Sequence, residues 1–130
     1  MQATRMTKQR LFILSELRKV TSHPTADEIY AMVRAKLPHI SLGTVYRNLE
    51  LLADNDEVQK LEYAGFQKRF DGNARPHPHV RCECCGRVAD VAGSFDEPGL
   101  PEGISAPGFT IHAARLEFFG WCQECRATLP

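Results

Sequence analysis

The cysteines form the clearest chemical pattern in this sequence. Four of the five fall in two CxxC pairs, Cys82/Cys85 and Cys122/Cys125. A gap of two residues places both sulfurs of a pair on one tight turn, and two such turns supply the four thiolates of a closed tetrahedral zinc site, with Zn–S bonds of about 2.3 Å. We therefore predict a structural zinc ion at these four cysteines.

Other interpretations of the pairs are disulfides, a thioredoxin-like redox motif and coincidence. A redox motif at Cys122/Cys125 would need a helix that starts at the first cysteine, and only five residues follow Cys125. Intracellular thiols stay reduced, which favours zinc over a disulfide. The fifth cysteine, Cys84, is interpreted as a spare thiol, with a redox role as the alternative.

Histidines and aspartates form a second group. His77 and His79 are two residues apart, so on a strand both rings point to the same face. Alone, this spacing is more typical of solvated surface residues. Asp71 and Asp90 flank it, however, and mixed imidazole and carboxylate ligands suit divalent iron, manganese or zinc. His23 can join them only if the fold brings it across.

The composition predicts a small soluble protein. A chain of 130 residues suits one ordinary domain or two small ones joined by a linker. No stretch approaches the roughly 20 apolar residues of a membrane span, and the first residues lead into no signal-like apolar segment. We therefore expect a cytoplasmic protein.

The zero net charge conceals an uneven distribution. Residues 1–70 contain 11 Lys/Arg and 8 Asp/Glu, whereas residues 71–130 contain 5 and 8. The front half is thus modestly basic, which permits DNA contact without proving it. The acidic back half contains His and Cys residues and suits cations.

Helical signals fill the front half. Leu11, Ile13, Leu14, Leu17 and Val20 recur at helical spacing between about residues 7 and 20. A capping box, residues 25–28, starts a second helix that we expect to run to residue 36 or 37. Ser41 can cap a third helix, which ends at residues 55–56. Strands follow at residues 58–63 and 66–70. Three helices and a hairpin are the order of a winged helix-turn-helix, whose third helix enters the DNA major groove.

The third helix offers candidate DNA contacts. Its inner face is Val45, Leu49 and Leu52, and its outer face is predicted to carry Thr44, Arg47 and Asn48. Arginine suits bidentate contact with guanine or phosphate. The alternative is one buried aromatic residue and one solvated arginine on an ordinary helix. The predicted DNA-binding residues are Ser41, Thr44, Tyr46 and Arg47. We interpret His39 as an exposed residue before this helix.

The back half is predicted to be a small sheet that carries the zinc. Residues 71–76 look like a hinge, and strands are expected at residues 79–82, 87–91 and 109–119. His112 would be a side chain of the last strand. The Gly- and Pro-rich residues 93–108 should form a long loop without a stable helix. The predicted organisation is a DNA-binding domain, residues 1–70, the hinge, and a metal-binding domain, residues 77–130.

These motifs, taken in order, resemble the ferric uptake regulator (Fur) family. The resemblance covers nearly the whole chain and rests on an ordered combination of segments that are ordinary one by one. The segments are RMTKQR (5–10), HPTADEIY (23–30), ISLGTVYRNL (40–49), RFD (69–71) and the two CxxC pairs.

The resemblance implies a dimeric, metal-dependent transcriptional repressor rather than an enzyme. The implied fold is α+β, an N-terminal winged helix followed by a small α/β dimerisation domain stapled by zinc. The regulatory iron or manganese site would fall on His23, Asp71, His77, His79 and Asp90. The implied partners are an operator in double-stranded DNA and a second copy of the chain.

Two of these positions point to the peroxide-sensing branch of the family. Iron-uptake regulators tend to carry Glu where this chain has Asp71 and Asp90. In the peroxide-sensing branch, iron reacts with hydrogen peroxide and ligand histidines are oxidised, which by position are His23 and His77. The alternatives are an iron- or manganese-uptake regulator of the same family or, from another class, a zinc-containing thiol redox protein. A metallohydrolase is disfavoured because five protein ligands leave little room for a substrate.

Two features of this chain depart from the family pattern. The family usually has a longer, basic N-terminal helix before the motif that starts at Arg5. Relatives commonly place a helix of the dimerisation domain where residues 93–108 stand. We therefore expect some loss of phosphate contacts and a dimer that is either weaker or built mainly from the sheet.

Overall fold

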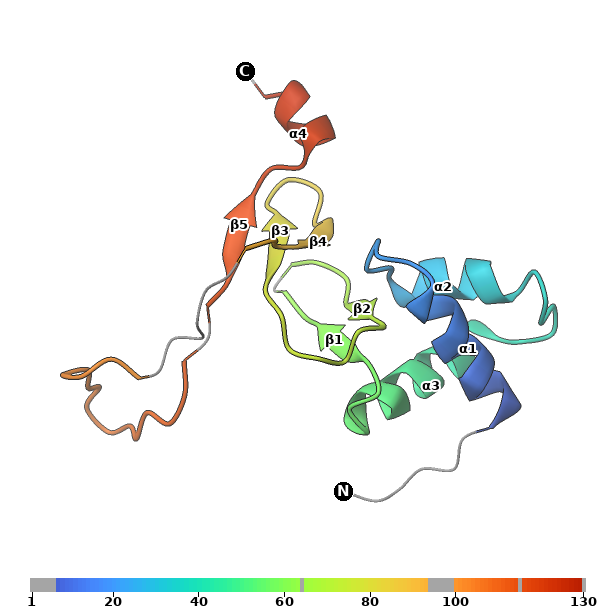
Figure 1. Cartoon of the computed structure of the whole chain (residues 1–130), viewed down its shortest axis with the longest axis horizontal. Helices are drawn as coiled ribbons and strands as arrows, with labels where there is room; N and C mark the ends of the chain where they lie inside the picture. Colours follow the sequence, from blue (N-terminus) through green and yellow to red (C-terminus); the bar gives the residue numbers. More distant parts are fainter. Residues whose placement is uncertain (1–6, 64, 94–99, 115, 130) are drawn as a thin grey trace.

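The protein is described by a computed structural model that covers residues 7–63, 65–93, 100–114 and 116–129. The start of the first motif, at Arg5 and Met6, and residues 94–99 of the Gly- and Pro-rich segment lie outside these ranges. The chain forms a helical half, a two-stranded wing and a three-stranded sheet, as Figure 1 shows. Within the described ranges, no helix is long and apolar enough to cross a membrane.

Side-chain caps define where the three front helices begin. Helices α1 (Lys8–Arg18), α2 (Ala26–Val33) and α3 (Leu42–Asp54) start after Thr7, Thr25 and Ser41, each of which accepts a backbone N–H three residues later. The predicted capping box of α2 is complete. Helix α2 is shorter than predicted. After Val33 the chain forms a turn, in which the Val33 carbonyl accepts hydrogen bonds from both the Lys36 and the Leu37 amides.

The hydrophobic core lies between these helices and the wing. Ile13, Leu17, Ile29 and Leu49 are fully buried in it, and Phe70 of the wing closes one side. Leu11, predicted to join them, is 51% exposed. At 100° per residue it lies off the stripe that the other buried residues of α1 form.

The wing is an antiparallel pair, β1 (Gln59–Leu61) and β2 (Arg69–Asp71), in which Lys60 lies opposite Phe70. Both strands are shorter than predicted. The chain leaves the ladder because Phe66 packs against the back half, where its ring would lie 2.3 Å from a Cβ added at Gly86. Gly86 also has a φ of +82°, which favours glycine. Both the backbone conformation and the space taken by the Phe66 ring therefore require glycine at this position.

The second sheet has the order β4-β3-β5. Strands β3 (His79–Cys82) and β4 (Val88–Asp90) are antiparallel, whereas β5 (Phe118–Gly120) runs parallel to β3. A strand over residues 109–119 was predicted, and this prediction is wrong for residues 109–114 and 116–117. A strand forms only where its backbone groups find partners, and the short β3 offers a ladder of three residues. His112 is accordingly an exposed residue outside any strand.

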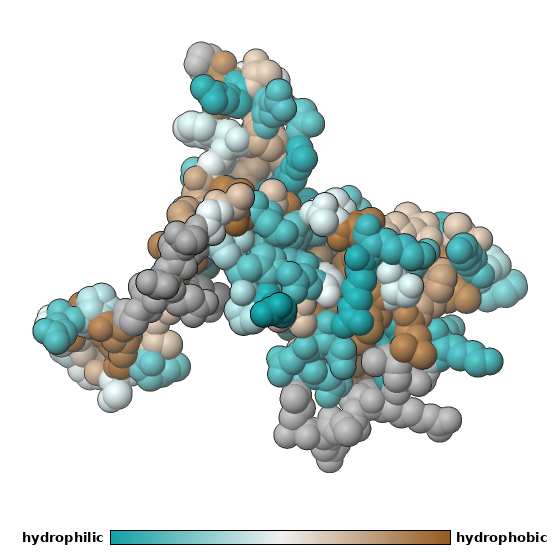
Figure 2. Space-filling view, in the orientation of Figure 1, coloured by the Kyte–Doolittle hydropathy of each residue, from teal (hydrophilic) through white to brown (hydrophobic). Residues whose placement is uncertain are grey.

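Residues 100–114, the projecting loop, extend away from both sheets in Figure 1. The described residues between β4 and β5, 91–93, 100–114 and 116–117, contain neither helix nor strand, in agreement with the prediction for Gly93 and residues 100–108. Figure 2 shows hydrophobic side chains on the surface of this loop, and Phe109 is 78% exposed. A short helix that was not predicted, α4 (Gln123–Ala127), follows β5.

Candidate metal centres and nucleic-acid interface

Five side chains from distant parts of the sequence converge on one point. One ligand atom from each of the five lies within 4.8 Å of every other. The Nε2 atom of His77 lies 2.7 Å from Asp71 Oδ2 and 2.9 Å from Asp90 Oδ1. Ligands bound to one ion at about 2.1 Å lie about 3 Å apart, so this spacing suits a single metal ion. The residues are His23, Asp71, His77, His79 and Asp90.

His23 reaches the cluster from the turn between α1 and α2. Its backbone has a φ of +53°, and its ring is almost fully buried. Strand β2 holds this turn, because the Phe70 amide donates to Pro24 O at 3.0 Å and Arg69 Nη1 donates to His23 O at 3.1 Å. His23 Nε2 therefore lies 3.1 Å from Asp71 Oδ2 and 2.8 Å from Asp90 Oδ1.

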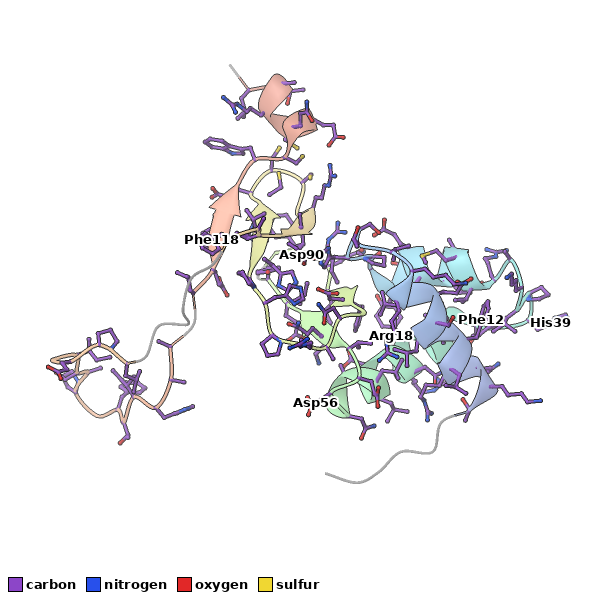
Figure 3. The ribbon with its side chains drawn as sticks, in the orientation of Figure 1. Phe12, Arg18, His39, Asp56, Asp90 and Phe118 are labelled. Carbon is purple, nitrogen blue, oxygen red and sulfur yellow. The ribbon has the colours of Figure 1, made fainter. Side chains whose placement is uncertain are left out.

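Three of the other four ligands come from the ends of strands, and His77 lies two residues before β3. Asp71 ends β2, and its Oδ1 accepts the Asn73 amide at 2.9 Å, which leaves Oδ2 for the histidines. His79 begins β3 and lies opposite Asp90, the last residue of β4. Figure 3 shows Asp90 on the side of its sheet that faces the helical half. The cluster thus lies between the two halves, whereas His39 lies at the far end of the helices.

The charges of the cluster compensate one another. Burial lowers the pKa of His23, but the hydrogen bonds and negative charges of Asp71 and Asp90 outweigh burial and raise it above its ordinary value. The pKa of His77 is also raised: burial opposes the shift, and the Arg75 carbonyl and both carboxylates produce it. Burial would raise the pKa of Asp71, yet hydrogen bonds from His23, His79 and the Asn73 amide hold it far below its usual range.

This donor set fits a divalent cation. Three imidazoles and two carboxylates match the ligands that iron and manganese accept. The cluster includes the almost fully buried His23, whose Nδ1 has no hydrogen-bond partner among the described residues. The residues that sequence reasoning proposed as regulatory ligands are all brought together here.

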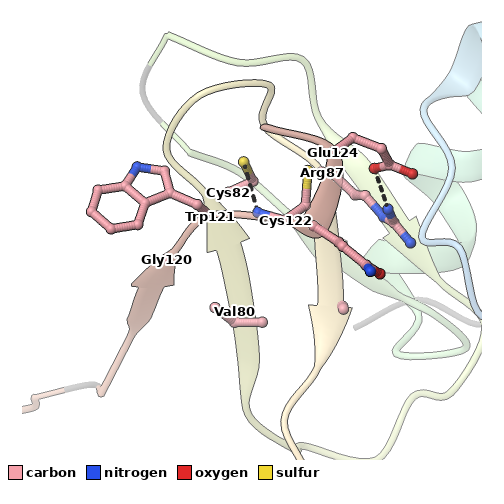
Figure 4. A pocket seen from close by; sticks show the side chains of 9 residues that line it. Val80, Cys82, Arg87, Gly120, Trp121, Cys122 and Glu124 are labelled. Atoms are coloured by element: carbon pink, nitrogen blue, oxygen red, sulfur yellow. Dashed lines mark hydrogen bonds and ion pairs between the residues drawn. The ribbon is translucent and has the colours of Figure 1, made fainter. Parts of the chain in front are cut away.

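The four cysteines of the CxxC pairs form a second cluster. Their Sγ atoms lie within 4.8 Å of one another, and Cys85 and Cys122 are 3.8 Å apart. Figure 4 shows Cys82 and Cys122 in the wall of a cavity of about 320 Å³, with the Cys122 amide donating to Cys82 Sγ at 3.3 Å. An Arg87–Glu124 ion pair of 2.9 Å links the segments that carry the two CxxC pairs.

The thiols of this cluster are shifted in opposite directions. Burial raises the pKa of Cys82, but hydrogen bonds from backbone N–H groups outweigh burial and lower the pKa to about 6. Hydrogen bonds with neighbouring thiols, first with Cys122, raise the pKa of Cys125. A low pKa favours the thiolate that zinc binds. Four thiols around one point, with one already activated, match a closed zinc site.

The sequence predicted no helix at Cys122/Cys125, which disfavoured a redox motif, and this prediction is wrong. Helix α4 starts directly after Cys122, which is its N-cap residue. The arrangement of the sulfurs favours zinc over a redox pair, because the Sγ atoms of both CxxC pairs surround one point. Cys84 is exposed and is not one of the four clustered cysteines.

Helix α3 presents part of the predicted DNA-contacting set. Ser41, Tyr46 and Arg47 are exposed, so the alternative of a buried aromatic residue at Tyr46 is wrong. Thr44 is partly buried and accepts a hydrogen bond from Arg47 Nη2 at 3.1 Å. The prediction that Asn48 lies on the outer face is wrong.

Asn48 is buried and joins two helices, because it accepts from Arg10 Nε at 2.9 Å. Sequence reasoning missed this pair, since a polar residue at helical spacing gives no sign of a distant partner. It also missed Asn73 and Arg69, which orient Asp71 and His23. Of these two residues, only Asn73 had a local signal in the sequence. It follows Asp71 by two residues, and an aspartate side chain often accepts the backbone amide at that spacing.

Fold and clusters together define a winged-helix DNA-binding protein with two metal centres. The ferric uptake regulator family profile matches residues 1–119, and the chain belongs to this family. Members of the family are transcriptional regulators and not enzymes.

Individual relatives agree with this assignment. The chain is 40% identical over 125 residues to the peroxide operon regulator of Bacillus subtilis (strain 168), which covers 93% of this chain and 83% of the relative. The structure of the Campylobacter jejuni peroxide stress regulator matches 65% of this chain and 62% of its own, at 36% identity and a TM-score of 0.58. The Helicobacter pylori ferric uptake regulator shares the fold over 94% of this chain and 82% of its own, with a TM-score of 0.70 and 24% identity.

Proposed function

We propose that this protein is a metal-dependent transcriptional repressor that responds to peroxide. One observation carries the proposal: His23 of the helical half and His77, His79 and Asp90 of the back half belong to a single cluster. The curated relatives include peroxide regulators that match nearly the whole chain. Cys82, Cys85, Cys122 and Cys125 hold structural zinc in this proposal, and the mixed cluster holds iron or manganese.

The cluster acts as a clamp between the two halves. Asp71 ends the wing and His23 lies in the turn between α1 and α2. The other three ligands come after the predicted hinge, residues 71–76. A cation neutralises the two carboxylates and links all five residues, so it favours the closed arrangement in which both halves contribute ligands. The proposed boundaries are residues 1–70 for DNA binding and 77–130 for metal binding and dimerisation.

Closure determines where the recognition helices lie. In a dimer, two copies of α3 must be spaced to match two operator half-sites, about one helical turn of DNA apart. The exposed Ser41, Tyr46 and Arg47, with Thr44, face the DNA in this arrangement. The exposed apolar side chains of the projecting loop and β5 suit a second copy of the chain, and Phe109 and Phe119 are among them.

Peroxide sensing follows from the identity of the ligands. Bound ferrous iron supplies the redox chemistry that turns hydrogen peroxide into an oxidant at the site. His23 and His77 hold their Nε2 atoms in the cluster, and an oxidised imidazole is a weaker donor. Loss of one donor weakens the clamp, and the dimer releases its operator.

A paired experiment tests this function. Operator binding is measured with iron or manganese, before and after peroxide, for the wild type and for His23→Ala, with the exposed His112→Ala as control. We expect metal-activated binding in the wild type and control but not in His23→Ala. Peroxide should abolish binding of the iron-loaded protein only, with oxygen added at His23 or His77 in mass spectra. Oxidation confined to cysteines would move the sensing role to thiols, and insensitivity to peroxide would indicate a metal-uptake regulator.

A further inference from the structure

Gln59, the first residue of β1, links the wing to the hinge. Its side-chain Nε2 lies 3.0 Å from Asn73 O and 2.7 Å from Arg75 O, both carbonyls of the predicted hinge. The same nitrogen lies 3.3 Å from Nδ1 of His77. Asp71, the last residue of the other wing strand, contacts the same segment, because its Oδ1 accepts the Asn73 amide at 2.9 Å.

The two carbonyls determine how the Gln59 amide is oriented. A carbonyl oxygen only accepts hydrogen bonds, so the side-chain nitrogen, and not the side-chain oxygen, must face Asn73 O and Arg75 O. The amide NH₂ has two hydrogens, and each of them has one carbonyl acceptor. The amide donors are therefore fully used by the hinge.

The Arg75 carbonyl in turn determines the tautomer of His77. Nδ1 of His77 lies 2.6 Å from Arg75 O. An unprotonated Nδ1 would direct a lone pair at this oxygen, so Nδ1 must carry hydrogen and donate it. Gln59 Nε2 then makes no hydrogen bond to Nδ1, because neither atom has a free lone pair for the other. When a cation is bound, Nε2 of His77 is the remaining ligand atom. Without a cation, Nε2 also carries hydrogen, since it lies 2.9 Å from Asp90 Oδ1 and 2.7 Å from Asp71 Oδ2.

We propose that Gln59 is a positioning residue for the regulatory metal site. It holds the Arg75 carbonyl at the point where this carbonyl fixes the tautomer and ring orientation of His77. Partners of this kind raise the affinity of metal-binding histidines, and their loss typically weakens metal binding 10- to 100-fold. The inference rests on the proposed function, since it requires a metal ion at the five-residue cluster.

Gln59 makes this support dependent on the wing. It lies opposite Asp71 in the β1–β2 ladder, so one pair of strands positions a ligand directly and a second ligand through the hinge. A displacement of the wing would move Asp71 and release His77 together. By contrast, Nδ1 of the buried His23 has no partner in the described structure, so the cluster does not support its histidines equally.

Replacement of Gln59 by methionine tests the proposal. Gln59→Met keeps the length of the side chain and removes its hydrogen-bond donors, and Gln67→Met, at an exposed position of the same hairpin, is the control. Mn²⁺ binding is measured on the full-length, zinc-loaded protein. We expect Gln59→Met to weaken Mn²⁺ binding about tenfold, with zinc content and melting temperature unchanged, and Gln67→Met to bind as the wild type does. Equal affinity of both variants and the wild type would overturn the proposal.

The hydrogen on Nδ1 of His77 supplies an independent measurement. NMR of the wild type with diamagnetic Zn²⁺ in both clusters should show this hydrogen exchanging slowly with water, because Arg75 O accepts it. It should exchange faster in Gln59→Met and at the wild-type rate in Gln67→Met. Equal exchange in the wild type and Gln59→Met would overturn the proposal. If the wild type binds no Mn²⁺ at all, the proposed function fails, whatever the exchange rate.

Discussion

Adjacent cysteines differ in role because of where their sulfurs point. Cys85 belongs to the four-thiol cluster and lies 3.8 Å from Cys122, whereas the exposed Cys84 is outside it. Both are exposed and adjacent in the chain, so they form a matched pair for substitution.

The cysteine pair gives a direct test of the zinc site. Cys85→Ser should abolish stoichiometric zinc and unfold at least the three-stranded sheet, because metal-binding free energy is folding free energy in such a small unit. Cys84→Ser should retain one zinc per chain. Zinc content and circular dichroism are the measurements, and a zinc-free Cys85→Ser protein that is fully folded would contradict the assignment.

The raised pKa values of His23 and His77 predict opposite effects of pH on stability and metal affinity. Without regulatory metal, protonated histidines stabilise the fold. This stability is fully present below about pH 6.5, the ordinary value, and is lost as the pH rises through the raised values. Mn²⁺ must displace the protons, so its affinity should rise over the same interval.

Thermal unfolding and Mn²⁺ titration between about pH 6 and pH 9 measure the two effects. Zinc-loaded, Mn²⁺-free wild type should melt at lower temperature as the pH rises, and His23→Ala should show a smaller change. A melting temperature that rises with pH would show that these histidines do not stabilise the metal-free fold.

At the scale of elements, helix α3 separates its two tasks by face. Val45, Leu49 and Leu52 are buried in the core, and Tyr46 and Arg47 are exposed between them. The Ser41 cap fixes where this helix begins and therefore which residues turn outward. Glu50 on the same helix binds Lys60 at 2.9 Å and Lys68 at 3.2 Å, so α3 also holds the wing.

Arg47→Ala should weaken operator binding without changing zinc content or the melting temperature. A bidentate contact with guanine is worth about 1 to 3 kcal/mol of discrimination. Arg34→Ala, at an exposed position after α2, is the control. The salt dependence separates two contacts: loss of a phosphate contact lowers the slope by about 1 for all sequences, whereas loss of a base contact relaxes specificity at one position. Wild-type binding by Arg47→Ala would remove α3 from the interface.

At the scale of the molecule, the wing contacts the back half outside the regulatory cluster as well. Near the wing tip, the ring of Phe66 packs against Gly86 and lies 4.8 Å from the Arg81 guanidinium. Tyr63 and Phe119 flank the same guanidinium at 5.3 and 5.1 Å. The zinc-bearing unit thus holds the wing even without regulatory metal.

Phe66→Ala should therefore raise the Mn²⁺ concentration needed for DNA binding. Loss of the cation–π contact alone is worth about 0.5 to 1 kcal/mol, which corresponds to roughly a two- to fivefold change. Zinc content should not change, and Gln67→Ala should behave as the wild type. An unchanged Mn²⁺ requirement would show that the wing contact does not favour the closed arrangement.

Local patterns were sufficient for the starts of the three front helices and for the cysteine pairs. Capping residues and helical spacing act within a few residues, so Thr25, Glu28 and Ser41 could be assigned their roles from the sequence. The two CxxC pairs likewise contain the turn geometry that their chemistry needs. The regulatory ligands were named through resemblance to a family, because neither the isolated His23 nor Asp90 has a local pattern.

Tertiary structure decided what depends on partners distant in the sequence. The buried Asn48 could not be recognised without Arg10, 38 residues away. Strand β5 is short because β3 offers so few partners, and Phe66 leaves the wing because Gly86 leaves room for its ring. Neighbouring residues therefore determined where the three front helices start and which cysteines could bind metal. Only the packing of the two halves decided which histidines and aspartates meet.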